Sequence, residues 1–359
     1  MENMDVIKSK FWHGKKVFLS GHTGFKGGWL TIWLAAMGAE VHGYAIDPPT
    51  EPNFYNVCNV GAHLKGETIA DVRNAETLTQ AIKTARPEVV FHLAAQPLVL
   101  HSYLEPVETY AVNVMGTVNL LEAARQISTI KAIVNVTTDK CYENKEWLWP
   151  YRECEALGGH DPYSSSKACS EIVSASYRRS FLASTNINLA SARSGNVIGG
   201  GDWAENRLVP DFLRAIDKGQ TLVIRYPEAT RPWQHVLEPL SGYLLLAERL
   251  YDNGKSFADA WNFGPEQTDS YTVRWIAEYL CSQIHSSNCK GSENPQPHEA
   301  NNLQLDISKA RKQLGWHPRW DLETALGHTL SWHSAWKNNS NMSEISLEQI
   351  RKYQKDGKP

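Results

Sequence analysis

Apolar and polar positions along the chain alternate with two different periods. Five short apolar runs have the length and composition of buried strands, at residues 16–20, 40–46, 88–94, 131–137 and 187–193. Between them the apolar residues recur at helical spacing, most clearly at residues 28–37, 77–85 and 106–125. Strands that alternate with helices predict an α/β fold in which a parallel sheet is covered on both faces. Such sheets bind their ligands at the carboxyl ends of the strands.

The pattern changes near residue 196, where Gly, Pro, Trp and Arg become more frequent and the apolar runs become shorter. Several loops are expected there, among them residues 286–302. We therefore expect a doubly wound domain over residues 1–195. Residues 196–359 should form mainly a smaller mixed α/β lobe, from which the chain is free to cross back to the first domain. The tail from Glu344 predicts one last amphipathic helix.

Composition narrows the range of partners. The chain has 36 basic and 39 acidic residues and a formal charge of -3, which gives no electrostatic reason to bind nucleic acid or an anionic membrane. No apolar run approaches the roughly 20 residues of a membrane span, and the first residues lack a signal-peptide core. We expect a cytoplasmic protein. Its six cysteines and 13 histidines show no metal-ligand spacing, so neither a metal site nor a disulfide framework is expected.

A glycine-rich turn stands between the first predicted strand and the first predicted helix. In FLSGHTGFKGGWL the glycines are Gly21, Gly24 and Gly27. Glycines at such a turn let backbone N–H groups approach a diphosphate at the positive end of a helix dipole. The spacing GxxGxxG alone fits a plain turn equally well. Its place between a strand and a helix favours a dinucleotide site in a Rossmann-type fold.

Asp47 follows the second predicted strand, 20 residues after Gly27. A carboxylate there can accept hydrogen bonds from the ribose hydroxyls and repels a 2′-phosphate. No Arg or Lys lies between Lys26 and Lys65 to reverse this preference. NAD is therefore favoured over NADP, although Asp47 fits equally well as a turn residue before Pro48.

Tyr163 and Lys167 lie four residues apart in GGHDPYSSSKACSE. Asp161 can cap a helix whose first position is Pro162, so the two side chains share one helix face. A phenol acts as a base at neutral pH only if positive charge lowers its pKa, and Lys167 can supply that charge. Tyr163 could then take the proton of a substrate hydroxyl while the carbon gives a hydride to NAD. The alternative is an incidental YxxxK at an exposed helix start.

At this point the chain resembles the extended short-chain dehydrogenase/reductase superfamily. The motifs GHTGFKG, DVR, HLAAQ, TTDK, YSSSK and DISKARKQLGWHP occur in the order typical of that superfamily. The resemblance implies that Asp71 and Val72 hold the adenine and that Leu93, Ala94, Ala95 and Gln96 line the far side of the cofactor. The remaining cofactor contacts expected from it are Thr23, Phe25, Lys26 and Thr137.

Asp139 and Lys140 place an acid and a base at a strand end, which a simple dehydrogenase does not need. A hexose oxidised at C4 has an acidic C5 hydrogen, which a base can remove while an acid protonates the departing C6 hydroxyl. This requires a protonated Asp139 and a partly neutral Lys140. Both side chains reach one substrate only if the strand breaks into a loop there. The alternative is a solvated Asp–Lys pair in an exposed loop.

The stretch is similar to that of sugar-nucleotide 4,6-dehydratases, where Thr138 would orient the C4 hydroxyl and Asp139 would be the acid. Most of that family carry glutamate next as the C5 base, and Lys140 departs from this, so the identity of the base stays open. TTDKCYENKEW, GGHDPYSSSK and RPWQHVLEPLSGYL look like the branch that acts on CDP-glucose and has lysine at this position. The resemblance also implies a role in deoxysugar and lipopolysaccharide biosynthesis.

The second half should bind the nucleotide sugar. A diphosphate favours guanidinium groups, and the candidates in order are Arg231, Arg207 and Arg193, the last of which fits an ion pair linking the domains equally well. Asn196 matches the substrate-binding asparagine of the family. Trp233 stands beside a ligand loop, as does Trp203, and either could stack on a base.

Two other functions fit parts of the pattern. A nucleotide-sugar 4-epimerase would share the fold, NAD, Tyr163 and Lys167 but has no use for Asp139 and Lys140. A protein that binds NAD without catalysis would need neither pair. By analogy with the family, we expect a homodimer or a dimer of dimers formed through the helices after Pro106 and Tyr163.

Overall fold

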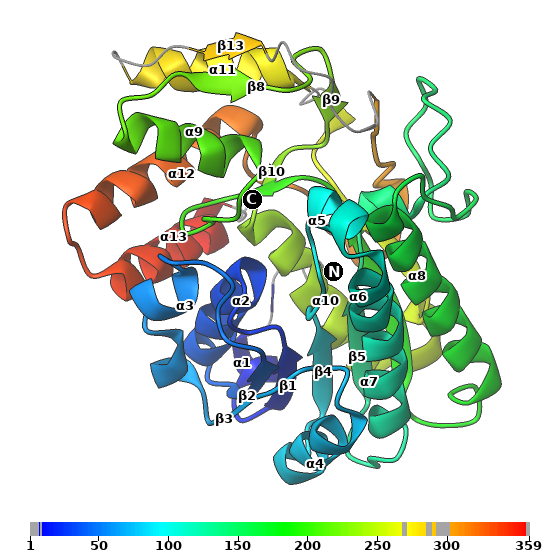
Figure 1. Ribbon diagram of the computed structural model, residues 1–359. Helices are drawn as coiled ribbons and strands as arrows, with labels where there is room; N and C mark the ends of the chain where they lie inside the picture. The colour runs from blue at the N-terminus through cyan, green and yellow to red at the C-terminus, as the bar shows by residue number, and fades with distance from the viewer. Residues whose placement is uncertain (1–6, 8, 268–270, 285–288, 292–301, 357–359) are drawn as a thin grey trace.

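The computed structural model describes residue 7 and residues 9–267, 271–284, 289–291 and 302–356 (Figure 1). Within these residues the main sheet has seven strands in the order β11-β6-β5-β4-β1-β2-β3, and every neighbouring pair is parallel. The strands are β1 (Lys16–Ser20), β2 (Glu40–Ala45), β3 (Gly66–Ile69), β4 (Val89–His92), β5 (Ala132–Val136), β6 (Asn188–Ser194) and β11 (Ala260–Phe263). This order confirms the predicted doubly wound α/β fold.

The central strands are apolar because both of their faces are covered. Every residue of β4, β5 and β6 is buried, which explains why these runs read as continuous rather than alternating hydrophobic segments. The strand order reverses between β1 and β4, which pair with each other through Val17 and Val89. In doubly wound sheets the crevice at such a reversal is where ligands bind.

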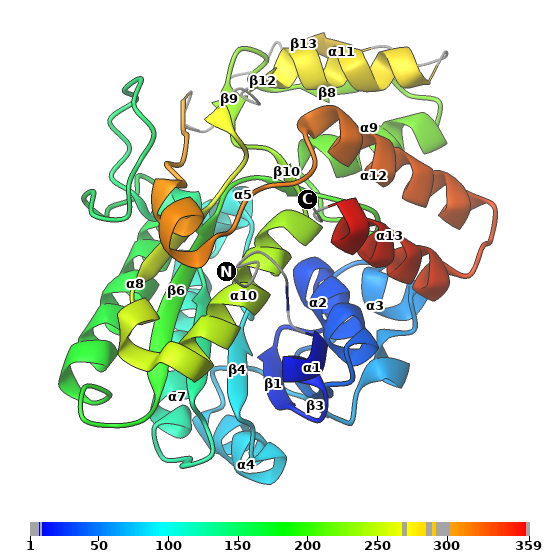
Figure 2. The same cartoon turned by 180° about the vertical axis from the view of Figure 1, so that it is seen from behind.

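Helices cover both faces of the sheet (Figures 1 and 2). One face packs against α2 (Phe25–Ala36) and α10 (Leu237–Asn253), with α13 (Met342–Asp356) outside α2. The other face packs against α4 (Ala75–Ala85), α7 (Gly116–Ala124) and α8 (Pro162–Ser180). The helix predicted over residues 106–125 is confirmed but is divided into α6 (Pro106–Tyr110), a π-helical turn η2 (Ala111–Met115) and α7.

A second lobe lies above the carboxyl ends of the strands (Figure 1). Its own hydrophobic core is formed mainly by α9 (Leu208–Asp217), β8 (Leu222–Ile224), α11 (Val273–Gln283) and α12 (Leu322–Lys337). Three two-stranded pairs complete it, namely β7 (Val197–Ile198) with β10 (Gln234–His235), β9 (Thr230–Arg231) with β12 (Tyr271–Thr272), and β8 with β13 (Cys289–Gly291). Although α10 and β11 follow residue 195 in the chain, β11 is a strand of the main sheet and α10 packs against that sheet. The division at residues 195 and 196 stays a prediction.

The remaining elements are short: α1 (Ser9–Trp12), α3 (Phe54–Val57), η1 (Val60–His63), α5 (Val99–Leu104), η3 (Asp139–Cys141), η4 (Gly254–Phe257) and η6 (Ala310–Leu314). The predicted last helix is confirmed as α13. Most of the loop predicted at residues 286–302, and the last three residues of the tail, lie outside the described residues. None of the helices in the described ranges is sufficiently long and apolar to cross a membrane.

Candidate active site

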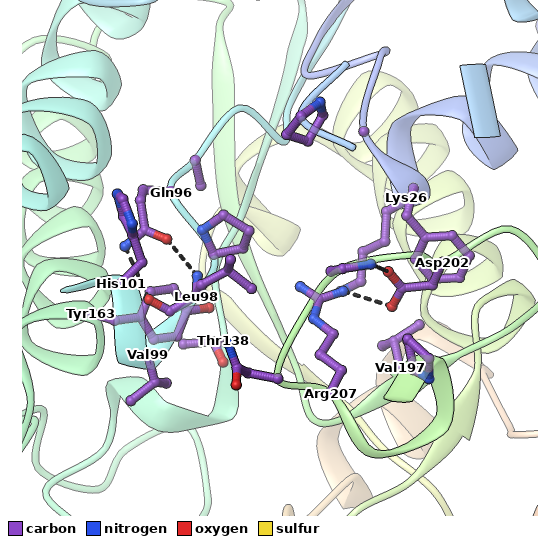
Figure 3. Close-up of a pocket in the computed structure, with 18 of the residues that line it drawn as sticks. Lys26, Gln96, Leu98, Val99, His101, Thr138, Tyr163, Val197, Asp202 and Arg207 are labelled. Atoms are coloured by element: carbon purple, nitrogen blue, oxygen red, sulfur yellow. Dashed lines mark hydrogen bonds and ion pairs between the residues drawn. The ribbon is translucent and has the colours of Figure 1, made fainter. Parts of the chain in front are cut away.

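A cavity of about 690 Å³ opens where the strands of the main sheet end, between the sheet and the second lobe (Figure 3). Residues directly after the strands line it, such as Gly21 after β1, Leu93 after β4 and Thr137 after β5. Among its lining residues are these predicted ones: Gly21, Thr23, Gly24, Phe25, Lys26, Gly27, Asp71, Val72, Leu93, Ala94, Ala95, Gln96, Thr137, Thr138, Asp139, Lys140, Tyr163, Lys167, Asn196, Arg207, Arg231 and Trp233. Asp47 and Arg193 are absent from the lining.

The glycine turn between β1 and α2 leaves no room for a side chain at Gly21 or Gly27. A Cβ atom on Gly27 would lie 2.0 Å from the carbonyl oxygen of Gly21, and one on Gly21 would lie 2.7 Å from the backbone nitrogen of Ala94. Gly21 also has a φ of +84°, a conformation that favours glycine. The turn therefore brings bare backbone to the wall of the cavity.

This part of the cavity fits a dinucleotide. No side chain caps the first turn of α2, because its N-cap residue is Gly24, so the N–H groups of that turn are available to a diphosphate. Asp71 lines the cavity beside the turn, where Arg73 donates to its carboxylate at 2.6 and 3.0 Å and lowers its pKa. Asp47 is exposed and is absent from the lining, although Ile46 before it and Pro49 after it are part of the lining. The ribose contact expected of Asp47 stays a prediction.

Tyr163 and Lys167 share one face of α8, as their spacing predicts. Asp161 caps the helix by accepting a hydrogen bond from the backbone N–H of Ser164 at 2.9 Å, and Pro162 is the first helical residue. Tyr163 is 8% exposed and Lys167 is 6% exposed. The ammonium group of Lys167 donates to the carbonyl oxygen of Val136 at 3.2 Å, which holds it against the end of β5.

Burial dominates the electrostatics of this cavity. It raises the pKa of the Tyr163 phenol to about 12, an effect that a hydrogen bond with Thr138 opposes. It also lowers the pKa of Lys167 to about 8 and that of Lys26 to about 7. The phenol thus needs an additional positive charge beside it before it can act as a base near neutral pH.

The strand that carries Asp139 breaks into a turn, as the proposed chemistry requires. β5 ends at Val136, the hydroxyl of Thr138 accepts a hydrogen bond from the backbone N–H of Lys140, and Asp139–Cys141 form a 3₁₀ turn. Both Asp139 and Lys140 line the cavity. Asp139 is 1% exposed and its Oδ1 accepts a hydrogen bond from Thr138 at 2.9 Å. Its Oδ2 is buried and has no hydrogen-bond partner in the described part of the chain.

We call Thr138, Asp139, Lys140, Tyr163 and Lys167 the reaction-centre wall, and Asn196, Arg207, Arg231 and Trp233 the substrate wall. Figure 3 shows Tyr163 and Thr138 on one side of the cavity and Arg207 on the other. The substrate wall comes from three short segments of the second lobe, one of which carries both Arg231 and Trp233. The titratable groups of the reaction-centre wall therefore face the candidate diphosphate-binding residues of the substrate wall.

Within the substrate wall, Arg207 donates to Asp202 at 2.8 Å, and about a third of its side chain stays exposed. Arg231 is 4% exposed and donates to the carbonyl oxygen of Thr230 at 3.0 Å. The indole Nε1 of Trp233 is buried and has no hydrogen-bond partner among the described residues.

Arg193 is not part of the substrate wall. Its side chain is 3% exposed and forms an ion pair with Glu171 of α8 at 2.9 Å, so its charge is already matched inside the fold. Of the two interpretations of Arg193, the structure therefore agrees with an ion pair. Both partners belong to the main sheet and its helices, so this pair does not link the two lobes.

Three lining features were not predicted from the sequence. Asp202 orients Arg207, and Ser194 accepts a hydrogen bond from the ammonium group of Lys26 at 2.8 Å. Residues 97–101, which include His101, close the side next to Tyr163 (Figure 3). The glycine run before Asp202 was a usable signal for a close backbone approach, whereas Ser194 and residues 97–101 carry no local signature.

The chain belongs to the GDP-mannose 4,6-dehydratase family, whose model matches residues 18–329. It is 50% identical over 355 residues to the CDP-glucose 4,6-dehydratase of Salmonella typhimurium (strain LT2), covering 97% of this chain and 98% of that protein. It is also 24% identical to a UDP-glucose 4-epimerase of Halalkalibacterium halodurans, over 88% of this chain and 95% of the relative.

Solved structures with the same fold include both reaction types. A dTDP-glucose 4,6-dehydratase of Streptomyces venezuelae with NAD and TYD bound has a TM-score of 0.76 and 23% identity, covering 90% of this chain and 98% of that one. A UDP-glucose 4-epimerase of Thermotoga maritima has a TM-score of 0.75 and 24% identity, covering 88% of this chain and 97% of that one. The fold is thus confirmed and does not by itself distinguish a dehydratase from an epimerase.

Proposed function

We propose that this chain is an NAD-dependent sugar-nucleotide 4,6-dehydratase that converts CDP-glucose to CDP-4-keto-6-deoxyglucose and water. The observation that carries the proposal is that Asp139 and Lys140 line the same cavity as Tyr163 and Lys167. Oxidation of a hydroxyl needs only the second pair, whereas loss of water also needs an acid and a base. The 50% identity to a CDP-glucose 4,6-dehydratase supports the same substrate.

The residues of the reaction-centre wall take separate roles in this reaction. Tyr163 accepts the proton of the C4 hydroxyl, which Thr138 orients. The new ketone makes the C5 hydrogen acidic, and Lys140 is our candidate for the base that removes it. Asp139 donates a proton to the C6 hydroxyl, which leaves as water. The unpartnered Oδ2 of Asp139 supports this role, because an oxygen that gives its proton to substrate should have no protein acceptor.

The residues around the glycine turn suit NAD, whose oxidised nicotinamide would supply the positive charge that the Tyr163 phenol lacks. NAD held by these residues would take up the hydride of C4 and supply it to C6 while C5 regains a proton, so the cofactor would be regenerated in each turnover. The oxidised nicotinamide would add positive charge beyond that of Lys167 and so favour the phenolate of Tyr163. Thr23, Phe25 and Lys26 of the glycine turn, together with Thr137, complete the proposed cofactor contacts.

The substrate wall would hold the nucleotide diphosphate. Arg207 and Arg231 offer guanidinium groups, which match phosphate oxygens in charge and geometry. Asn196 and the free indole N–H of Trp233 offer neutral donors at the same wall. The choice of cytosine over other bases rests on the sequence relationship and on none of these contacts.

A panel of nucleotide sugars tests the proposal. The purified protein, with NAD added, is incubated separately with CDP-glucose, UDP-glucose, dTDP-glucose and GDP-mannose, and the products are identified by NMR and mass spectrometry. We expect loss of one water from CDP-glucose at a rate far above that of the other three. A galactose-configured product without loss of water would favour the 4-epimerase, and binding of NAD without turnover of any sugar would favour a non-catalytic role.

We also propose that the protein is a homodimer, with a dimer of dimers as the larger alternative. Large apolar side chains are exposed on α5, α6 and α8, most of all Leu104 at 77%, Val107 at 81% and Ile172 at 57%. An exposed apolar surface of this kind favours contact with a second copy. Analytical ultracentrifugation should show a dimer that Val107→Glu converts to a monomer; a monomeric native protein would contradict the proposal. The cytoplasmic location and the link to lipopolysaccharide stay predictions.

A further inference from the structure

One buried ion pair lies directly behind the turn that carries Asp139. Glu171 follows Tyr163 by eight residues and Lys167 by four on α8, so it continues the same helix face. Its carboxylate accepts Nε and Nη2 of Arg193 on β6 at 2.9 and 3.0 Å. The two side chains are only 2% and 3% exposed. Neither residue lines the cavity, so any effect on the reaction must be transmitted by other residues.

Glu171 anchors the residue before the turn. The hydroxyl of Thr137 donates to Oε1 of Glu171 at 2.5 Å, and the hydroxyl of Ser191 donates to Oε2 at 2.5 Å. Together with the two bonds from Arg193, the carboxylate therefore accepts four hydrogen bonds. Thr137 immediately precedes Thr138 and Asp139, so the start of the turn is fixed to the helix that carries Tyr163.

Arg193 anchors the residue after the turn. Its Nη1 donates to the hydroxyl of Tyr142 at 2.7 Å, and this hydroxyl in turn donates to Oδ1 of Asn262 on β11 at 2.7 Å. Tyr142 is 1% exposed and its ring lies 4.8 Å from the guanidinium carbon. Because the 3₁₀ turn ends at Cys141, the same ion pair holds the chain on both sides of Asp139 and Lys140.

The pair is ionised in the folded protein. Burial opposes the charge of Glu171, but the charge of Arg193 and the hydrogen bonds lower the pKa of the carboxyl below its usual value. A buried ion pair usually adds little stability compared with apolar side chains of the same size. The hydrogen bonds that the pair makes to Thr137 and Tyr142 explain its position better than a gain in stability does.

We propose that Glu171 and Arg193 are positioning residues that hold the Asp139–Lys140 turn in one place relative to Tyr163 for the elimination of water. The inference rests on the proposed function, because it concerns that reaction's second stage. A displacement of about 1 Å in a reacting group can cost on the order of 100-fold in rate. A turn tied at both ends to the helix of Tyr163 resists such a displacement.

The sharpest test is Tyr142→Phe. Glu171→Gln would leave Arg193 buried without a counter-charge, which can prevent folding. Tyr142→Phe removes the hydrogen bonds at the end of the turn but keeps the ion pair and the ring, which stacks on Tyr151 at 5.1 Å. With CDP-glucose, we expect elimination of water to slow about tenfold while oxidation at C4 changes less than about twofold. Stopped-flow absorbance should then show bound NADH accumulating before product appears.

Tyr251→Phe is the matched control. It removes a tyrosine hydroxyl that donates to Glu88 at 2.7 Å. Glu88 directly precedes β4, so this contact lies at the amino ends of the strands, opposite the end that carries the cavity. The control should leave both stages unchanged. If Tyr142→Phe slows both stages equally, or neither, Glu171 and Arg193 are merely structural and the inference is wrong. If the native protein removes water from no nucleotide sugar, the proposed function itself fails, which is a distinguishable result.

Discussion

The two walls of the cavity are assembled in different ways. The reaction-centre wall comes from one helix and one strand end, and the side chains of Asp139, Tyr163 and Lys167 are at least nine-tenths buried. The substrate wall comes from three separate short segments, and its Arg207 is about one-third exposed. Hydrogen bonds and an ion pair support the first wall from behind. In the second wall the side chain of Arg207 stays partly exposed, which suits a surface that must admit and release a nucleotide sugar.

Removing the phenol of Tyr163 should have the largest effect, because both stages depend on the first oxidation. We expect Tyr163→Phe to lower kcat with CDP-glucose by about 10³-fold. Bound NADH should not form, since the C4 hydroxyl keeps its proton. Stopped-flow absorbance with circular dichroism as a folding control measures this. A variant that still reduces NAD rapidly would exclude Tyr163 as the base.

Asp139→Asn should separate the two stages within the reaction-centre wall. We expect kcat to fall by about 10²-fold, because the C6 hydroxyl loses its proton donor. Oxidation at C4 should continue slowly, so bound NADH should accumulate. Unchanged turnover would remove the reason to prefer a dehydratase over an epimerase.

Arg207→Met should affect binding rather than chemistry, which would sharpen the contrast between the walls. We expect KM for CDP-glucose to rise about tenfold with kcat within about threefold, because one charge-assisted contact to the diphosphate is lost. Arg351→Met is the control, since Arg351 is exposed and pairs with Glu344 on α13. A large fall in kcat at unchanged KM would instead assign Arg207 to the reaction centre.

The smallest effect is expected on stability. Burial lowers the pKa of Lys167 from 10.5 to about 8, so between about pH 8 and 10.5 the unfolded chain binds more protons than the folded one. The free energy of unfolding therefore gains from Lys167 as pH rises through this window, and Lys167→Met lacks this gain. Below pH 8 the variant should be more stable than the native protein by roughly 3 kcal/mol, and the difference should shrink towards pH 10.5. Urea unfolding at several pH values measures it, and a pH-independent difference would contradict the buried, strained lysine.

The sequence predicted the sheet well where strands are buried on both faces. β4, β5 and β6 are continuous apolar runs and lie where expected. β3 (Gly66–Ile69) was not predicted, because it is a short edge strand whose residues are only partly buried. β11 (Ala260–Phe263) was not predicted as a member of the main sheet, since it follows the second lobe in the chain and only its tertiary pairing with β6 identifies it.

In the site, too, the sequence predicted what depends on local patterns and missed what depends on tertiary contacts. Tyr163 and Lys167 were brought together by helical spacing, and the turn at Asp139 follows from the end of an apolar strand. Asp47 was assigned by its distance from Gly27, and its contact stays a prediction, because such a count does not give the direction of a side chain in a loop. Arg193 could not be placed from sequence, because its partner Glu171 is distant in the chain. Interactions between neighbouring turns of a helix are visible in a sequence, whereas ion pairs across the fold are not.

The central claim is that oxidation and loss of water occur in one cavity, and an isotope experiment tests it most directly. CDP-glucose carrying deuterium at C4 is incubated with the purified protein without added NAD and then with it, and the product is examined by NMR. We expect deuterium at C6 of a 4-keto-6-deoxy sugar, which requires the hydride to leave C4 and return within the same site. Deuterium retained at C4 of a galactose-configured product would contradict the claim and assign the chain to the epimerases.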